Sequence, residues 1–449
     1  MMSSSTRLQP PTTSTSKRSR SRESQHSLNL SPILKQQESN HDASVPAFLR
    51  QSRAAVSTKF TALYVQDQER LLASQQNPDP SSEWFQEATP DVKARNRYPD
   101  VQAWANSRIH LKVPEGQCDY INASPISLRD PRTGANVRYI ATQGPQQTGL
   151  SYFWQMIWHE SKEVAVIVML TRTAEAGRDK CFQYYPLDPE NDSFQINTGN
   201  ETNDTPTGSV RLLETDFHQA SRATVSKLLL TFGEETKTVW HLLFSGWSDH
   251  NVPEDEDRTG LLELIKLSAA KNTGPDNPRI VHCSAGVGRS GTFIALEHLL
   301  AELAAGSLAD AKDDDDLIYN TVCELRKQRM MMVQSLTQYQ FLYQVLRDEV
   351  KKAQNTARQN PARQNHEVKD LGKSTDGTEE PSPKMIKLTK GFKGAILGKT
   401  PWCRRRADHE SDQNRSTIEP RTTVLLGLGI GVGVLLLAYG LKAFFRGVP

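Results

Sequence analysis

The segment VHCSAGVGRSGTF, residues 281–293, constrains the fold of this 449-residue chain more than any other. An apolar run ends at Cys283, Arg289 follows six residues later, and a helical pattern begins directly after. Only small residues lie between, so successive backbone N–H groups from about Ser284 to Arg289 can form an anion-binding nest in front of the helix. The pattern predicts a strand, a loop and a helix that together bind a phosphate dianion.

The same segment indicates nucleophilic chemistry. A cysteine beside a helix N-terminus and an arginine can have its pKa lowered from about 8.5 to roughly 3.5–7.5, which makes it a thiolate at neutral pH. The planar guanidinium of Arg289 can bind two phosphate oxygens and bind them more strongly as charge shifts during transfer. We therefore expect Cys283 to attack and Arg289 to stabilise charge.

Two other phosphate-binding motifs fit this segment less well. Gly286, Gly288 and Gly291 have the GxGxxG spacing of a dinucleotide site, with aspartates at 313–316 about twenty residues on. That site needs its acidic residue at the end of a second strand, and no apolar run precedes these aspartates. A nucleotide P-loop is also disfavoured, because no lysine precedes Ser290.

Composition indicates one ordered domain with polar tails. Hydrophobic residues make up 37% of the chain and its mean hydropathy is -0.58, low values for a wholly globular protein of this length. We predict a disordered tail over residues 1–45, a catalytic domain over 46–352 that begins near Phe48, and a disordered polar linker over 353–421. The net charge of +2 gives no nucleic-acid footprint. Five widely spaced cysteines suggest a reducing compartment without a disulfide framework or zinc site.

Apolar runs within the domain predict its fold class. Three are rich in β-branched residues: RYIATQ (138–143), VAVIVML (164–170) and PRIVHC (278–283). They alternate with helical patterns such as 293–303. We expect a mixed α/β domain in which helices flank a central, twisted and largely buried mixed sheet.

The segment Thr422–Leu441 has the length and composition of a membrane helix. Its twenty residues carry no charge, and as a helix they would span about 30 Å, the thickness of the hydrocarbon core. We predict a transmembrane tail anchor followed by a short tail, 442–449, with the catalytic domain facing the cytoplasm. Its glycines, at 427, 429, 431 and 433, give two overlapping GxxxG spacings that favour self-association. The endoplasmic reticulum and the mitochondrial outer membrane both fit this anchor.

Residues 281–293 resemble the signature loop of the classical, non-receptor protein tyrosine phosphatases. Further motifs follow that family's order: KARNRYPD (93–100), DYINAS (119–124), RYIATQGP (138–145), VIVMLTRTAEAGRDKCFQYYP (166–186), WSDHNVP (247–253) and QRMMMVQSLTQYQFLY (328–343). The resemblance implies the cysteine-based phosphatase fold and hydrolysis of phosphotyrosine in proteins through a phosphocysteine. It also implies no metal or cofactor, and phosphotyrosine-containing proteins as partners.

The resemblance implies a role for each matching residue. Asp249 would be the general acid and then the base, Gln334 would position water, and Gln338 would assist it. Ser290 would donate its hydroxyl to the sulfur, or alternatively cap the helix. The phosphate loop would comprise Ser284, Ala285, Gly286, Val287, Gly288 and Arg289. Tyr98 would form a wall of a pocket deep enough to select phosphotyrosine, and Asp100 would bind the substrate backbone.

Three further residues match family positions close to the active site. His282 resembles the family residue that orients the loop, whereas Glu175 and Lys180 match a loop that flanks the site or form only a surface ion pair.

Departures from the family pattern motivate an alternative. Ser248 replaces the usual Pro, Asn251 the usual Gly, and Met331 a Gly that opens a second phosphotyrosine pocket in some members. The first two motivate a catalytically weak phosphotyrosine-binding module as the alternative function. A dual-specificity enzyme is disfavoured by the NRY segment at 96–98, which deepens the pocket.

Overall fold

The computed structural model describes residues 45–76, 78–188, 193–196, 208–247, 251–308 and 315–359. The predicted N-terminal tail up to residue 44, the predicted general acid Asp249 with Ser248, and the predicted membrane anchor lie outside these ranges. Among the helices of the described ranges, none is long and apolar enough to cross a membrane.

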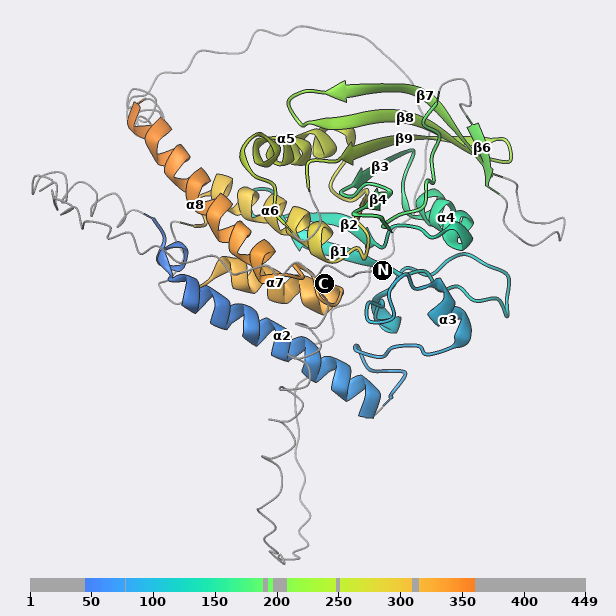
Figure 1. Ribbon diagram of the computed structural model, residues 1–449, viewed down its shortest axis with the longest axis horizontal. Helices are drawn as coiled ribbons and strands as arrows, with labels where there is room; N and C mark the ends of the chain where they lie inside the picture. Colours follow the sequence, from blue (N-terminus) through green and yellow to red (C-terminus); the bar gives the residue numbers. More distant parts are fainter. Residues whose placement is uncertain are drawn as a thin grey trace, which may run out of the picture. The chain divides into compact units, whose positions relative to one another are not determined.

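A mixed eight-stranded sheet forms the centre of the described domain (Figure 1), in the order β1-β2-β10-β3-β9-β8-β7-β6. Its four middle strands, β2, β10, β3 and β9, are parallel, and the outer pairs are antiparallel. The strands are β1 (Ala123–Arg129), β2 (Asn136–Thr142), β3 (Val164–Met169), β6 (Ser193–Ile196), β7 (Gly208–His218), β8 (Ala223–Phe232), β9 (Glu235–Phe244) and β10 (Arg279–His282). A separate hairpin pairs β4 (Ala174–Glu175) with β5 (Arg178–Asp179).

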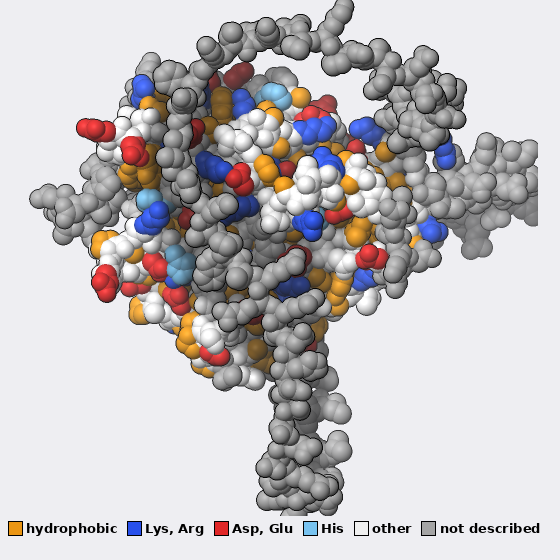
Figure 2. Space-filling view, turned by 180° about the vertical axis from the view of Figure 1, so that it is seen from behind, with side chains coloured by type: hydrophobic (Ala, Val, Ile, Leu, Met, Phe, Trp, Pro, Cys, Tyr) orange, Lys and Arg blue, Asp and Glu red, His pale blue; other side chains and the backbone are white. Residues whose placement is uncertain are grey.

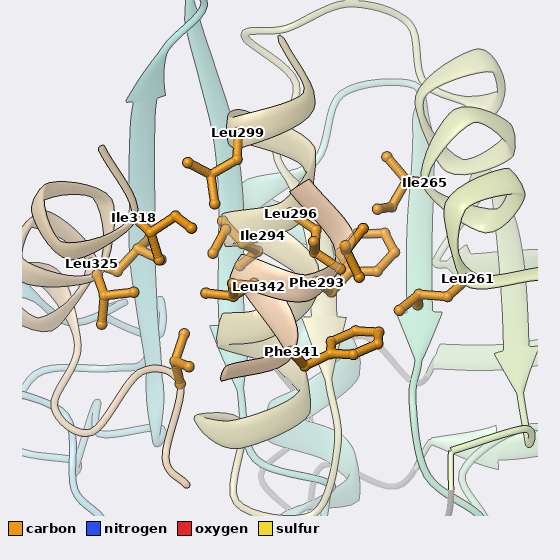
Figure 3. Packing of buried hydrophobic residues seen from close by; sticks show 14 of the residues in the cluster. Leu261, Ile265, Phe293, Ile294, Leu296, Leu299, Ile318, Leu325, Phe341 and Leu342 are labelled. Carbon is orange, nitrogen blue, oxygen red and sulfur yellow. The ribbon is translucent and has the colours of Figure 1, made fainter. Parts of the chain in front are cut away.

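Helices cover both faces of the sheet. They are α2 (Arg53–Gln76), α3 (Pro90–Arg95), α4 (Leu150–Glu160), α5 (Asp255–Lys271), α6 (Gly288–Ala305), α7 (Leu317–Gln328) and α8 (Leu336–Gln359), with short 3-10 turns η1 (Ala47–Arg50), η2 (Ala105–Ser107) and η3 (Gln147–Gly149). Figure 3 shows α6 between its neighbours, with Phe293 and Leu296 facing Leu261 and Ile265 of α5 and Phe341 of α8.

Strand periodicity divides the core into two hydrophobic clusters. Side chains alternate across a strand, so Val166 and Val168 of β3 pack with α5 to α8, whereas Ala165 and Ile167 pack against α4. A strand that is apolar on both faces must be covered on both, which explains why the buried parallel strands were visible as continuous apolar runs.

The structure confirms the predicted mixed α/β class, because the three apolar runs form β2, β3 and β10. The long antiparallel strands β7, β8 and β9 were not predicted individually. Helix α8 continues to Gln359, so the first residues of the predicted polar linker are helical.

The surface carries no field of one sign on the face shown in Figure 2. Basic and acidic side chains are interspersed there, in agreement with the net charge of +2. No group of His, Cys, Asp or Glu in the described ranges is arranged to hold a metal ion.

Candidate active site

Cys283 lies directly after β10, at the carboxyl end of the parallel part of the sheet. Because β10 pairs in parallel with both β2 and β3, the ends of those strands meet the loop at the same edge. This is where ligands bind in sheets of this kind. Cys283 is buried at the base of the loop, with 4% of its surface exposed.

Close backbone packing fixes the loop after Cys283. Gly286 adopts φ +73°, and a Cβ there would lie 2.2 Å from the Thr142 carbonyl oxygen at the end of β2. A Cβ on Gly288 would meet the amide of Gln338 at 3.0 Å and that of Gln334 at 3.3 Å. The small residues seen in the sequence are therefore required by the packing of the loop as well as by anion binding.

Arg329 holds the loop from behind, a role that sequence analysis missed. Its fully buried guanidinium donates to the carbonyl oxygens of Gly286 (2.9 Å) and Ala285 (3.1 Å), and to Asn122 Oδ1 (2.8 Å) and Ser124 Oγ (3.1 Å). Burial lowers the pKa of Arg329 to about 10, so the side chain still carries its charge at neutral pH. A carbonyl held on the outer side of the loop is consistent with N–H groups directed inward.

The loop stabilises the thiolate of Cys283. Burial alone would raise its pKa, but the charge of Arg289, the hydroxyl of Ser290 and the backbone N–H groups of Ser290 and Gly286 outweigh it. The pKa of the thiol therefore lies below its usual range, as predicted from the sequence.

Glu175 anchors Arg289 beside the sulfur. Its Oε1 and Oε2 accept hydrogen bonds from Nη1 at 2.8 Å and Nη2 at 2.6 Å, and the Leu170 carbonyl accepts from Nη1 at 2.9 Å. Burial would raise the pKa of Glu175, but the hydrogen bonds and charge of Arg289 keep it below the usual value. Glu175 therefore belongs to the site and is not confined to a surface ion pair.

Tyr98 reaches the loop through Ser284. The Ser284 hydroxyl donates its one proton to the Lys180 carbonyl at 2.9 Å, so the Tyr98 hydroxyl must be the donor in its 2.8 Å contact with Ser284 Oγ. The predicted pocket wall is thus tied to the phosphate loop. Asp100, two residues after Tyr98, is exposed.

The remaining predicted residues surround the start of α6. Gln334 is exposed and Gln338 is buried, and both amides lie beside Gly288. The residue at the N-cap position of α6 is Val287, so Ser290 does not cap the helix. Its buried hydroxyl has no well-aligned hydrogen-bond partner among the described residues, but it lies where it helps to lower the pKa of Cys283.

Asn251 and Met331, two of the residues that depart from the family pattern, lie within the described ranges. The backbone carbonyl of Asn251 accepts a hydrogen bond from the Trp247 indole at 2.8 Å. Met331 adopts φ +57°, a left-handed conformation that favours glycine, and its side chain is half-buried.

The thiolate site at the end of a parallel strand defines a cysteine-based phosphatase. Residues 92–348 match the family model for protein-tyrosine phosphatase. The chain belongs to the protein-tyrosine phosphatase family.

Three of the relatives are named as tyrosine-protein phosphatases. The chain is 35% identical over 331 residues to tyrosine-protein phosphatase 1 of Saccharomyces cerevisiae, an alignment covering 67% of this chain and 96% of that protein. It is 34% identical over 301 residues to tyrosine-protein phosphatase 2 of Schizosaccharomyces pombe, covering 65% of this chain and only 39% of that protein. The human non-receptor type 7 enzyme is 36% identical over 57% of this chain and 64% of its own length.

Solved structures share the fold. The catalytic domain of human protein tyrosine phosphatase non-receptor type 18 is 28% identical, with a TM-score of 0.53 over 66% of this chain and 96% of that chain. The same protein in complex with HER2 phosphopeptides is 26% identical, with a TM-score of 0.54 over 71% of this chain and 97% of that chain.

Proposed function

We propose that the protein hydrolyses phosphotyrosine in proteins through a phosphocysteine at Cys283. One observation carries the proposal: the thiol with a lowered pKa lies in a loop that also presents Arg289, an arrangement suited to a phosphate dianion. The Cys283 sulfur attacks phosphorus, and the bond from phosphorus to the phenolic oxygen breaks. Asp249 gives its proton to that oxygen as the leaving group departs.

In the second step, water attacks the phosphocysteine and the sulfur leaves. Asp249 accepts a proton from that water, and Gln334 positions the water with the help of Gln338. The hydroxyl of Ser290 donates toward the departing thiolate, which its position near the sulfur supports. Tyr98 stacks on the substrate ring, and Asp100 accepts hydrogen bonds from the peptide backbone. Phosphotyrosyl peptides as substrates are further supported by the HER2 phosphopeptide complexes of the related human enzyme.

The test is Cys283→Ser in the full chain. We expect hydrolysis of a phosphotyrosyl peptide to fall below detection while the peptide still binds, because Arg289 and the loop N–H groups are unchanged. The alternative, a binding module with little activity, predicts that the unsubstituted protein is already inactive while it binds the peptide. Measurable turnover by Cys283→Ser would show that another residue is the nucleophile.

We further propose that residues 422–441 anchor the protein in the endoplasmic reticulum or the mitochondrial outer membrane, with the catalytic domain in the cytoplasm. The support is the uncharged twenty-residue stretch and the basic residues that bound it, Arg421 and Lys442. Ending the chain after Arg421 should move the protein from the membrane fraction to the supernatant on centrifugation of a cell lysate. Continued pelleting with membranes would contradict the anchor. Crosslinking of the full chain, with Gly429→Leu as the comparison, tests self-association through the glycines.

A further inference from the structure

A chain of hydrogen bonds crosses the core behind Cys283. The hydroxyl of Tyr184 lies 2.6 Å from Nε2 of His241 on β9 and 2.7 Å from Nε2 of His282 on β10. Nδ1 of His282 lies 3.1 Å from the carbonyl oxygen of Cys283. Strand β3 separates β9 from β10, so Tyr184 links two strands that do not pair with each other. All three side chains are fully buried.

The direction of each hydrogen bond follows from the number of protons available. Burial lowers the pKa of His282 to about 4, so its ring is neutral and carries a single N–H at neutral pH. The Cys283 carbonyl can only accept, which places that proton on Nδ1 and leaves Nε2 as an acceptor. The Tyr184 hydroxyl therefore donates its one proton to His282 at 2.7 Å, in preference to the Met169 sulfur at 3.7 Å, and must accept from Nε2–H of His241.

An independent observation agrees with this assignment. If His241 carries its proton on Nε2, its Nδ1 is a bare lone pair. That Nδ1 is the buried ring atom that lacks a hydrogen-bond partner within the described part of the chain. A bare acceptor in the core is less costly than an unsatisfied N–H, so the tautomer that the chain requires is also the tautomer that this environment favours.

We propose that His241 is a positioning residue of the active site, acting on Cys283 through Tyr184 and His282. Hydrogen bonds that all point in one direction polarise one another. The N–H of His241 therefore strengthens the hydrogen bond that Tyr184 donates to His282, and this bond strengthens the one that His282 donates to the Cys283 carbonyl. The last donor polarises the peptide between Cys283 and Ser284, which makes the Ser284 N–H a better partner for negative charge. The reaction at the site rests on the proposed function, but the hydrogen-bond chain does not.

The chain keeps its protons in place because few charges face it. Burial lowers the pKa of His241 well below its usual value, and the neighbouring His282 lowers it further. The Tyr185 ring stacks on His241 at 3.9 Å between ring centroids. The charge of Arg97 opposes protonation of His282. Cys181 and Tyr185 are the titratable groups that act on Tyr184, and Cys181 also acts on Tyr185. Both imidazoles therefore remain uncharged donors at neutral pH.

The experiment measures alkylation of Cys283 by iodoacetamide over a pH series in the full chain, with mass spectrometry of the modified fragment. Tyr184→Phe and His241→Leu each remove one donor from the chain of hydrogen bonds, whereas His241→Gln keeps an N–H that can reach Tyr184. Tyr185→Phe is the matched control, because it removes a buried hydroxyl beside the chain without changing it. Circular dichroism confirms that each variant is folded.

We expect Tyr184→Phe and His241→Leu to alkylate about two- to fivefold more slowly below the pH at which the thiol ionises, because their thiolate is less stabilised. Tyr185→Phe and His241→Gln should follow the unsubstituted protein more closely. The double variant Tyr184→Phe with His241→Leu should alkylate no more slowly than Tyr184→Phe alone, since the chain of hydrogen bonds is then already interrupted.

An unchanged pH profile in Tyr184→Phe would overturn the proposal, as would equal shifts in Tyr184→Phe and Tyr185→Phe or in His241→Gln and His241→Leu. An unchanged profile in a folded His241→Leu would overturn it as well. If His241→Leu does not fold, His241→Phe, which keeps a ring and has no N–H, takes its place in the comparison with His241→Gln. A protein that alkylates as expected but does not hydrolyse phosphotyrosine would contradict the proposed function alone.

Discussion

At the scale of single residues, Glu175 determines how Arg289 is presented to a substrate. Both carboxylate oxygens of Glu175 bind the guanidinium, and the Thr171 hydroxyl holds Oε1 at 2.9 Å. An arginine without this partner could rotate about its long side chain, whereas the bidentate pair fixes its plane. The contact joins residues 114 positions apart, which local sequence patterns do not reveal.

We predict that Glu175→Gln lowers kcat/KM for a phosphotyrosyl peptide by about 10- to 100-fold, the scale of a lost charge-assisted hydrogen bond. Steady-state kinetics measures the effect, with Glu234→Gln in the exposed turn before β9 as the control. Equal kinetics for Glu175→Gln and the unsubstituted protein would show that the carboxylate does not orient Arg289.

Glu175 also makes a prediction about stability and pH. A carboxyl group with a depressed pKa stabilises the fold fully above its ordinary value and loses that contribution as pH falls through the depressed value. Urea unfolding should therefore find Glu175→Gln less stable at neutral pH, with a difference that narrows below about pH 4. A difference that grows on acidification would contradict the pairing with Arg289.

At the scale of elements, Arg329 connects the end of α7 to the phosphate loop and to the start of β1. Its donors satisfy acceptors from both sides. The motif around Arg329 predicts no role for this side chain, because an arginine is usually at the surface. Its burial depends on the contact between α7 and a loop more than 40 positions earlier.

We predict that Arg329→Met lowers the free energy of unfolding by roughly 3–5 kcal/mol, since several buried acceptors lose a charged donor. Arg329→Lys should recover only part of it, because an ammonium cannot reproduce the planar fork. Urea unfolding and the KM for a phosphotyrosyl peptide measure the two effects, with Arg211→Met on exposed β7 as the control. Similar losses in Arg329→Met and Arg211→Met would exclude the proposed support of the loop.

The elements that the sequence predicted best are those with the simplest physical signal. Strands β2, β3 and β10 are apolar on both faces. The predicted helix from Phe293 onward belongs to α6, which follows β10 after the phosphate loop. Strand β7 gives a weaker signal, because six consecutive residues from Leu213 to His218 are exposed and the strand lacks a buried alternation there. The nucleophile and its arginine were found from local spacing, but Glu175, Arg329 and His241 meet the site only through the tertiary fold.

At the scale of the whole molecule, one loop connects the fold to the chemistry. The parallel strands bring the carboxyl ends of β2, β10 and β3 together, and helix α6 starts where the loop ends. The site lies within residues 92–348, which match the protein-tyrosine phosphatase family model. The proposed function therefore depends on whether the phosphoryl group passes through Cys283.

The most direct test is to trap that intermediate. The full chain and its Gln334→Ala variant are quenched in acid during turnover of a phosphotyrosyl peptide, and their fragments are analysed by mass spectrometry. We predict one phosphoryl group on the fragment that contains Cys283, more of it in Gln334→Ala because the second step is slowed, and none in Cys283→Ser. Turnover without a phosphorylated enzyme, or with the phosphoryl group on another side chain, would contradict the account.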